Sequence, residues 1–304
     1  MDEEKTGLIK TEVRRMGEIR DFKCTYDNSA GISEEVTKGL DMEFPDAYLH
    51  WETMTELAIR LKEHDHAAFC ELPFCHTVEA EAMGGIVNYG NEKIGPRAKE
   101  YICTEPESLL ELPEIDFSKG RIHEVLLACK ALREQGEQVV LNISGPFTIL
   151  NVLIDAKYVF KAMRKKPELM KKVFWKLGEQ LLRFMDEAKR YGVNMISYAD
   201  SSGGVNILGP KMAQQVMEDF TYDFLKQAKE RADGQVLILL CPKTTFALVG
   251  TKRAEFRERE LIGPMSYGEG CIEMIGKAAF TGQTCIKNIG YQLKNGMIKE
   301  VILK

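Results

Sequence analysis

Apolar runs and amphipathic stretches alternate along this chain. One apolar run, VLILLC at 236–241, is preceded by Gly234 and followed by Pro242. Consecutive apolar residues do not alternate between core and solvent, so this run predicts a strand buried on both faces, as in a parallel sheet. Cys241 then lies at the carboxyl end of that strand, where α/β proteins carry their substrates. The alternative interpretation is a buried cysteine that acts as a small hydrophobe.

The same alternation predicts several more helices and strands. Helical spacing of apolar residues predicts helices over 46–65, 122–132, 170–188 and 210–224. Short apolar runs predict strands over 67–72, 138–144, 194–200 and 284–289. Near the end of the chain, Asn295-Gly296 between two alternating runs predicts a hairpin with a type I′ turn.

Repeated strand–helix units predict an α/β fold, either a (β/α)8 barrel or a doubly wound sheet. The strands evident in the pattern are too few to choose between the two. We find no linker or short repeat, so we expect one main domain over 46–304, preceded by an N-terminal flank or lid over 1–45. A glycine-rich phosphate-binding motif after a strand is also missing, which argues against nucleotide binding.

The composition of the chain limits the classes of partner that we expect it to bind. The formal charge is -5 over 304 residues, with lysine and arginine scattered, so nucleic acid is not an expected partner. No apolar run reaches the length of a signal peptide core or a membrane span, so we expect no membrane association and a cytoplasmic location. In that compartment the eight cysteines should be thiols.

Polar residues that follow predicted strands are the candidates for chemistry. The loop after strand 67–72 contains Cys75, His76, Glu79 and Glu81. The two glutamates also suit a solvated first helical turn, where the helix dipole favours acids, and we weigh both interpretations equally. Asp200 ends the strand over 194–200 and is a candidate for a functional carboxylate, with loop bracing or helix capping as the alternative.

Five segments in order carry a resemblance to a known family. They are FPDAYLHWETMTELA, LPFCHTVEAEAMGG, GRIHEVLLACKALRE, NISGPFTILNVLID and YADSSGGVNILGP. Together they resemble the uroporphyrinogen decarboxylase superfamily, and within it the cobamide-dependent branch typified by methylcobamide:coenzyme M methyltransferases. The resemblance covers roughly 40–225 and weakens after Cys241. It implies a single TIM-type (β/α)8 barrel, here with a truncated or irregular C-terminal third, and a site at the carboxyl ends of the strands.

The resemblance also implies a zinc site. In that branch a His-x-Cys pair at the end of a strand and a later cysteine hold the ion. Cys241 matches the cysteine of the pair and Cys285 matches the later one, but Leu239 stands where the histidine is expected. Catalytic zinc usually has three protein ligands, so a third must come from elsewhere. We take Glu81 as that candidate, with His76, Glu79 and Cys75 as others; the alternative is that the metal has been lost.

The activity implied is methyl transfer between a corrinoid protein, which carries cobalamin, and a small-molecule methyl donor or thiol acceptor. Zinc would lower the pKa of a bound thiol. Asp200, His76 and Glu79 are the candidate catalytic residues. Two alternatives remain open: a decarboxylase like uroporphyrinogen decarboxylase, or a degenerate paralogue that only binds a corrinoid or another ligand. The first fits less well, because Arg14, Arg15 and Arg20 do not form the arginine-rich run expected there.

Overall fold

A mostly parallel sheet forms the centre of the molecule. The structure, a computed structural model, describes residues 22–304 except 25, 27–29, 39 and 41. Five strands run parallel and are neighbours in the spatial order β1 (Cys70–Leu72), β4 (Val139–Ser144), β5 (Met195–Ala199), β6 (Leu237–Leu240) and β8 (Phe280–Thr281). Because they are parallel, their carboxyl ends share one edge of the sheet.

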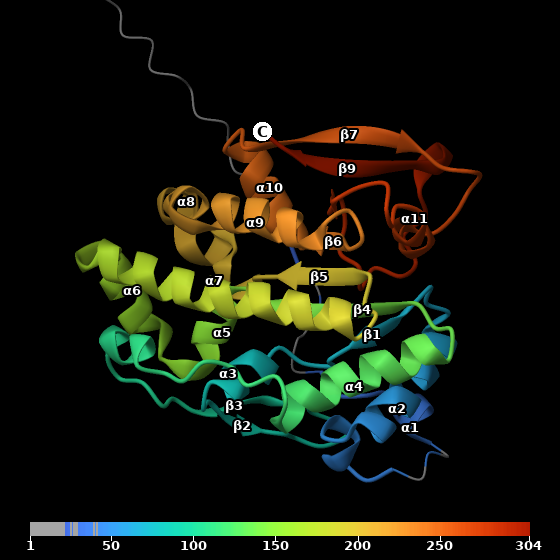
Figure 1. The fold of residues 1–304 in the computed structure, drawn as a ribbon, viewed down its shortest axis with the longest axis horizontal. Coiled ribbons are helices and arrows are strands. Elements are labelled where there is room, and N and C mark those ends of the chain that lie inside the picture. Colours follow the sequence, from blue (N-terminus) through green and yellow to red (C-terminus); the bar gives the residue numbers. More distant parts are fainter. Residues whose placement is uncertain (1–21, 25, 27–29, 39, 41) are drawn as a thin grey trace, which may run out of the picture.

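The far end of the sheet is antiparallel. Strand β9 (Met297–Leu303) pairs in this sense with β8 and with β7 (Ala254–Glu260). Figure 1 shows β7 and β9 together at the top of the molecule, in the orange and red of the last residues. Among the described residues, backbone pairing runs from β1 to β7 without joining those two strands. The α/β class is therefore as expected, and the antiparallel end is the irregular C-terminal third that the sequence predicts.

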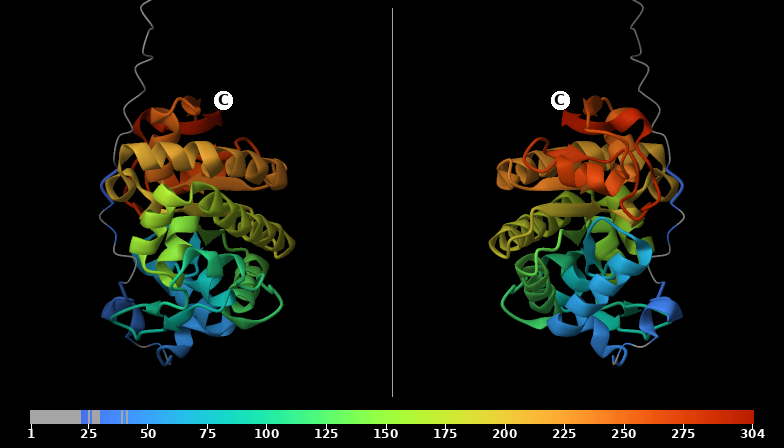
Figure 2. Two further views of the ribbon diagram at one scale, coloured as in Figure 1. Left: turned by 90° about the vertical axis from the view of Figure 1, so that its left-hand side faces the viewer. Right: turned by 90° about the vertical axis from the view of Figure 1, so that its right-hand side faces the viewer.

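Helices connect the parallel strands. The long ones are α2 (Trp51–Asp65), α4 (Gly120–Glu134), α7 (Pro167–Arg190), α8 (Val205–Val216) and α9 (Tyr222–Ala232). The shorter ones are α1 (Glu34–Thr37), α3 (Val78–Ala82), α5 (Pro146–Leu153), α6 (Ala156–Lys165), α10 (Pro242–Gly250) and α11 (Tyr267–Glu273). A separate antiparallel pair comprises β2 (Ile86–Asn88) and β3 (Arg97–Glu100). In both views of Figure 2 the chain rises from the blue N-terminal elements to the red C-terminal strands.

Two apolar cores pack against opposite faces of the sheet. Ile238 and Leu240 of β6 belong to the larger core, which contains the helices α4, α7 and α9. Leu237 and Leu239 belong to a second core together with Tyr267 of α11. Alternate residues of one strand thus enter different cores, which confirms the prediction that β6 is buried on both faces.

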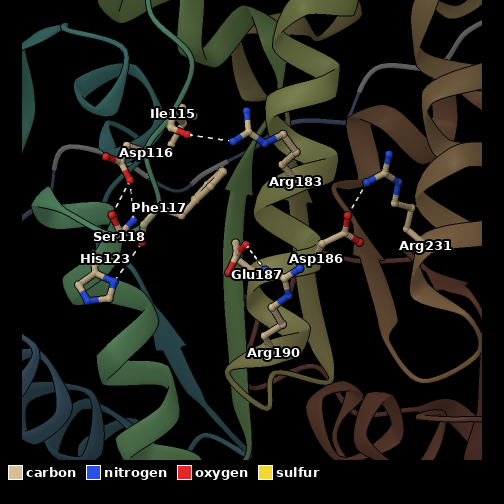
Figure 3. Close-up of polar contacts among 10 residues, drawn as sticks. All are labelled: Ile115, Asp116, Phe117, Ser118, His123, Arg183, Asp186, Glu187, Arg190 and Arg231. Carbon is tan, nitrogen blue, oxygen red and sulfur yellow. Dashed lines mark hydrogen bonds and ion pairs between the residues drawn. The ribbon is translucent and has the colours of Figure 1, made fainter.

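Polar contacts fix α7 to its neighbours, as Figure 3 shows. Arg183 donates to the carbonyl of Ile115, in the loop that precedes α4, over 3.5 Å. Arg231 of α9 pairs with Asp186 on the other flank of α7. In the same loop as Ile115, the carbonyl of Phe117 lies 3.0 Å from Nδ1 of His123. These contacts hold the helix layer together and belong to the scaffold.

The C-terminal predictions are partly wrong. Residues 284–289 form turns instead of a strand, and the nearby strand is β8. Asn295 and Gly296 both have positive φ (54° and 67°), as a type I′ turn requires. However, β9 pairs with β7 and β8 instead of with the residues before that turn, so the predicted hairpin does not form. The turn chemistry is local, whereas the choice of partner strand is a long-range decision.

The remaining expectations concern the ends and surfaces of the chain. Most of the expected flank over 1–45, including Arg14, Arg15 and Arg20, lies outside the described residues. Its described part contains α1 and an isolated bridge from Ala30 to Ile94, and the boundary at residue 45 stays a prediction. None of the described helices has the length and apolar character needed to cross a bilayer.

Candidate functional site

Two thiols lie at the carboxyl edge of the sheet. Cys241 directly follows β6 and is the N-cap residue of α10, and Cys285 lies four residues beyond β8. Strands β6 and β8 are paired neighbours, with Leu239 opposite Thr281. Both thiols are partly exposed, whereas Cys70, Cys75, Cys103, Cys129 and Cys271 are buried. The prediction that Cys241 ends a strand is therefore confirmed.

The surroundings of these thiols favour their protonated form. Burial raises the pKa of Cys241 to about 11 and that of Cys285 to about 12. Each is raised further by the exposed thiol of Cys24, and Cys285 also by Cys241. Neutral thiols are poor nucleophiles and poor metal ligands until a cation or a base intervenes.

An ion pair joins the segment after β8 to β1. Nζ of Lys287 lies 2.9 Å from Oε1 of Glu71, and Nδ2 of Asn142 donates to the same oxygen over 2.7 Å. Burial opposes ionisation of Glu71, but Lys287 and Asn142 outweigh it and lower the pKa of this carboxyl. The charge of Glu71 in turn raises the pKa of Lys287. At neutral pH the site thus contains a carboxylate and an ammonium in contact.

His76 lies beside this pair. Burial, followed by the charge of Lys287, lowers the pKa of His76 to about 4, so its imidazole is neutral at physiological pH. Its Nδ1 atom is shielded from solvent and has no hydrogen-bond partner among the described residues. A cavity of about 260 Å³ opens here, lined by Tyr26, Glu71, His76 and Lys287 among others. A cavity lined by an ion pair and a neutral imidazole is a candidate place for a polar ligand.

Asp200 and Glu79, the other predicted catalytic residues, brace the loops after β4 and β5. Asp200 accepts hydrogen bonds from the amides of Phe147 (3.3 Å) and Thr148 (2.9 Å), at the start of α5, and from Oγ1 of Thr148 (3.0 Å). Burial raises the pKa of Asp200 to about 6 despite these donors. Glu79 accepts from the amide of Ser144 over 2.7 Å, and burial raises its pKa. These contacts suit the bracing alternative, and a catalytic role for either residue stays a prediction.

Glu81, the predicted third metal ligand, is engaged with a buried cation. Its Oε2 accepts from Nε of Arg121 over 2.7 Å, and its Oε1 accepts from the hydroxyl of Tyr89 over 2.7 Å. Arg121 also donates to Sγ of Cys75 (3.0 Å) and to Oγ1 of Thr77 (2.6 Å). We call these five residues the Arg121 cluster.

The donors for a metal ion are incomplete. All eight cysteines and all five histidines lie within the described residues. No three His, Cys, Asp or Glu side chains of that part of the chain are arranged to hold a metal ion, so Cys241, Cys285 and Glu81 do not form such a group there. Leu239 offers no donor atom and is buried in the second core. These residues do not fit the zinc site that the resemblance implies.

Two residues of the site, Glu71 and Lys287, were not predicted from the sequence. Glu71 is the one charged residue in the apolar run over 67–72, and a charge inside a predicted buried strand is a signal for a site. Lys287 follows Cys285 by two residues, but it lies in the segment that was predicted to be a strand. Their pairing depends on the tertiary structure, because the two residues are far apart along the chain.

The fold and this edge define an α/β protein with its polar site at the carboxyl ends of parallel strands. Residues 31–256 match the family model of uroporphyrinogen decarboxylase (URO-D), and the chain belongs to this family, which has a TIM-barrel fold. Among solved structures it resembles a methyltransferase from Methanosarcina mazei, with a TM-score of 0.61 and 22% identity over 74% of this chain and 68% of the other. That likeness supports the same fold.

Two curated relatives point to one branch of the family. The chain is 29% identical over 191 residues to the methylcobamide:CoM methyltransferase MtaA of Methanosarcina barkeri (strain Fusaro / DSM 804), covering 62% of this chain and 56% of the relative. A second MtaA, from Methanosarcina barkeri, is 29% identical over 208 residues, covering 67% and 60%. The chain thus matches less than two thirds of the length of either relative. The expected membership of the uroporphyrinogen decarboxylase superfamily is confirmed, and both relatives carry the name of its methyltransferase branch.

Proposed function

We propose that this chain catalyses methyl transfer between a corrinoid protein and a small molecule, either a methylated donor or a thiol acceptor. The names of its curated relatives support this reaction class. The observation that carries the proposal is the polar carboxyl edge. Two partly exposed thiols, Cys241 and Cys285, lie at this edge, which also carries a cavity lined by His76, Glu71 and Lys287. The corrinoid, bound to its own protein, would carry the transferred methyl group on its cobalt.

In this proposal the chain positions the small molecule and handles its proton. His76 lines the cavity with a neutral imidazole, and this ring accepts a hydrogen bond from the S–H or N–H group of the substrate. Lys287 presents its ammonium to negative charge on the reacting atom. Asp200 and Glu79 hold the loops that border the site. The predicted zinc assistance has no step here, because the described donors do not make up a ligand set.

The test is a methyl-transfer assay with methylcobalamin and a panel of small thiols. We expect the cobalamin spectrum to report loss of the methyl group, and mass spectrometry to detect the matching methyl thioether. The variant His76→Ala should lose about tenfold in kcat/KM, roughly one hydrogen bond to the reacting group. The matched control is His50→Ala, at an exposed histidine before α2.

Two other results would contradict the proposal. Conversion of uroporphyrinogen to coproporphyrinogen, with no methyl loss for any thiol, would assign the chain to the decarboxylases of its family. Tight binding of methylcobalamin or of a corrinoid protein, without turnover of any donor or acceptor, would instead identify a non-catalytic binding protein.

A further inference from the structure

The position of the missing zinc histidine is filled by the core. Leu239 is 1% exposed and packs with Val140 of β4 and Met195 of β5 in the second core. Cys241, two residues later, directly follows β6. Of the two residues expected to hold a zinc ion, only Cys241 has a donor atom. Leu239 packs in the core at the position where the histidine is expected.

A different cation lies at this edge. Lys287 follows Cys285 by two residues, and its ammonium is 2.9 Å from Glu71 of β1. Glu71 is itself held by Asn142 of β4 over 2.7 Å, so the ion pair is anchored on two strands. An ammonium has three N–H donors, and the contact with Glu71 needs only one of them. Lys287 also lines the cavity, where a ligand can meet the remaining donors.

We infer that the ammonium of Lys287, positioned by Glu71, takes the place of a metal ion beside Cys285, so that this site works without zinc. The inference does not depend on the proposed methyl transfer, because metal content and thiol reactivity are measured without turnover. An ammonium supplies fixed positive charge to an anionic substrate group, as a metal ion would, but binds no ligand covalently. It therefore needs neither the histidine nor three converging donors.

Metal content tests the first half of the inference. Wild-type protein, expressed with added zinc and desalted, should contain far less than one zinc per chain by plasma mass spectrometry. A chelator should leave its thermal midpoint unchanged. About one zinc per chain, lost in Cys241→Ser, would overturn the inference, whatever the third ligand. A zinc site in which Cys24 supplies the third ligand would therefore also overturn the inference.

Restoring the histidine provides the converse test. Leu239→His recreates the His-x-Cys spacing, and with Cys285 it should bind about one zinc per chain. The matched control is Leu237→His, which introduces the same side chain into the same core, one strand period away from the required spacing. Equal zinc uptake by both variants would contradict the inference. If Leu239→His fails to fold, the zinc content of the wild type still decides.

Thiol reactivity tests the role of the ammonium. The rate at which iodoacetamide alkylates Cys285 is measured by peptide mass spectrometry at one fixed pH. Lys287→Met should slow alkylation about three- to tenfold, since it leaves the negative charge of Glu71 alone near the thiol. Glu71→Gln should accelerate it by a similar factor, because the ammonium is then unopposed. Lys287→Arg should stay close to wild type.

The control for this experiment is Lys277→Met, which removes an exposed lysine paired with Glu273. It should leave the rate unchanged, as surface charges are screened. Opposite shifts in Lys287→Met and Glu71→Gln support the inference. Unchanged rates in both variants, or shifts of the same sign, would show that the ion pair does not set the charge at the thiols.

Discussion

Two polar clusters in this protein each combine a cation, a glutamate and cysteine, but they serve different purposes. In the Arg121 cluster, the guanidinium donates hydrogen bonds to Glu81, Cys75 and Thr77. The hydroxyl of Tyr89 donates to the other carboxylate oxygen of Glu81. At the site formed by Cys241, Cys285, Glu71, Lys287 and His76, one ion pair is complete, but the thiols are partly exposed and Nδ1 of His76 is unpaired.

The difference separates residues that serve the fold from residues that await a ligand. A buried charge costs several kcal/mol unless it is paired, so a fully paired cluster is costly to break and has no donor or acceptor left for a substrate. An unpaired atom beside a cavity bears that cost without a partner in the protein. This contrast moves Glu81 from the metal site, where the sequence placed it, to the scaffold.

The largest effect should come from breaking the Arg121 cluster. Arg121→Met leaves the carboxylate of Glu81 without its cation, and we expect a loss of about 3–5 kcal/mol in the free energy of unfolding. Urea denaturation monitored by circular dichroism measures it. The control is Arg190→Met, an exposed arginine paired with Glu187, which should change stability by about 0.5 kcal/mol or less. A loss below about 1 kcal/mol for Arg121→Met would contradict the structural role.

His76 should make the fold sensitive to acid. Its folded pKa of about 4 is below the usual 6.5, so its contribution to stability is complete above pH 6.5 and is lost as the pH falls through 4. The full contribution is about 3 kcal/mol. The variant His76→Gln should lack this decline in urea unfolding measured between pH 7 and pH 4. A decline that persists unchanged in the variant would mean that another group causes it.

Asp200 should act with the opposite sign. Its folded pKa of about 6 is above the usual 3.8, so its contribution is complete below pH 3.8 and is lost as the pH rises through 6. This contribution is also about 3 kcal/mol, and in the wild type it offsets that of His76. Asp200→Asn should therefore show a steeper loss of stability on acidification than the wild type. The same series of urea titrations measures it, and a shallower loss would contradict the sign.

The smallest effect concerns the close approach of the loops after β4 and β5. A Cβ atom on Gly145 would lie 2.3 Å from Cβ of Asp200, so Gly145→Ala must push the loops apart. We expect a loss of about 1–3 kcal/mol, the usual cost of overpacking. Gly290→Ala is the control, because its added Cβ meets no atom within 4 Å. Equal thermal midpoints for the two variants would show that the loops yield without cost.

The sequence alone determined the regular parts of this protein. Helices α2 and α7 and strands β4, β5 and β6 follow from apolar periodicity, which is a local property of the chain. The position of Cys241 at the end of β6 follows from the same pattern. The five segments that resemble the uroporphyrinogen decarboxylase superfamily identified the family, since residues 31–256 match its model.

Only the tertiary structure decided which side chains meet. Glu71 and Lys287 are far apart along the chain, and they form a pair because the segment after β8 returns to β1. Glu81 was predicted as a metal ligand from its place in the loop, but it accepts a hydrogen bond from Arg121 on α4. Likewise, β9 follows a correct turn and still pairs with β7. The periodicity of apolar residues is a local property that predicts which residues are buried. The pairing of side chains and of strands depends on contacts between distant segments, and these form only when the helices and the sheet pack together.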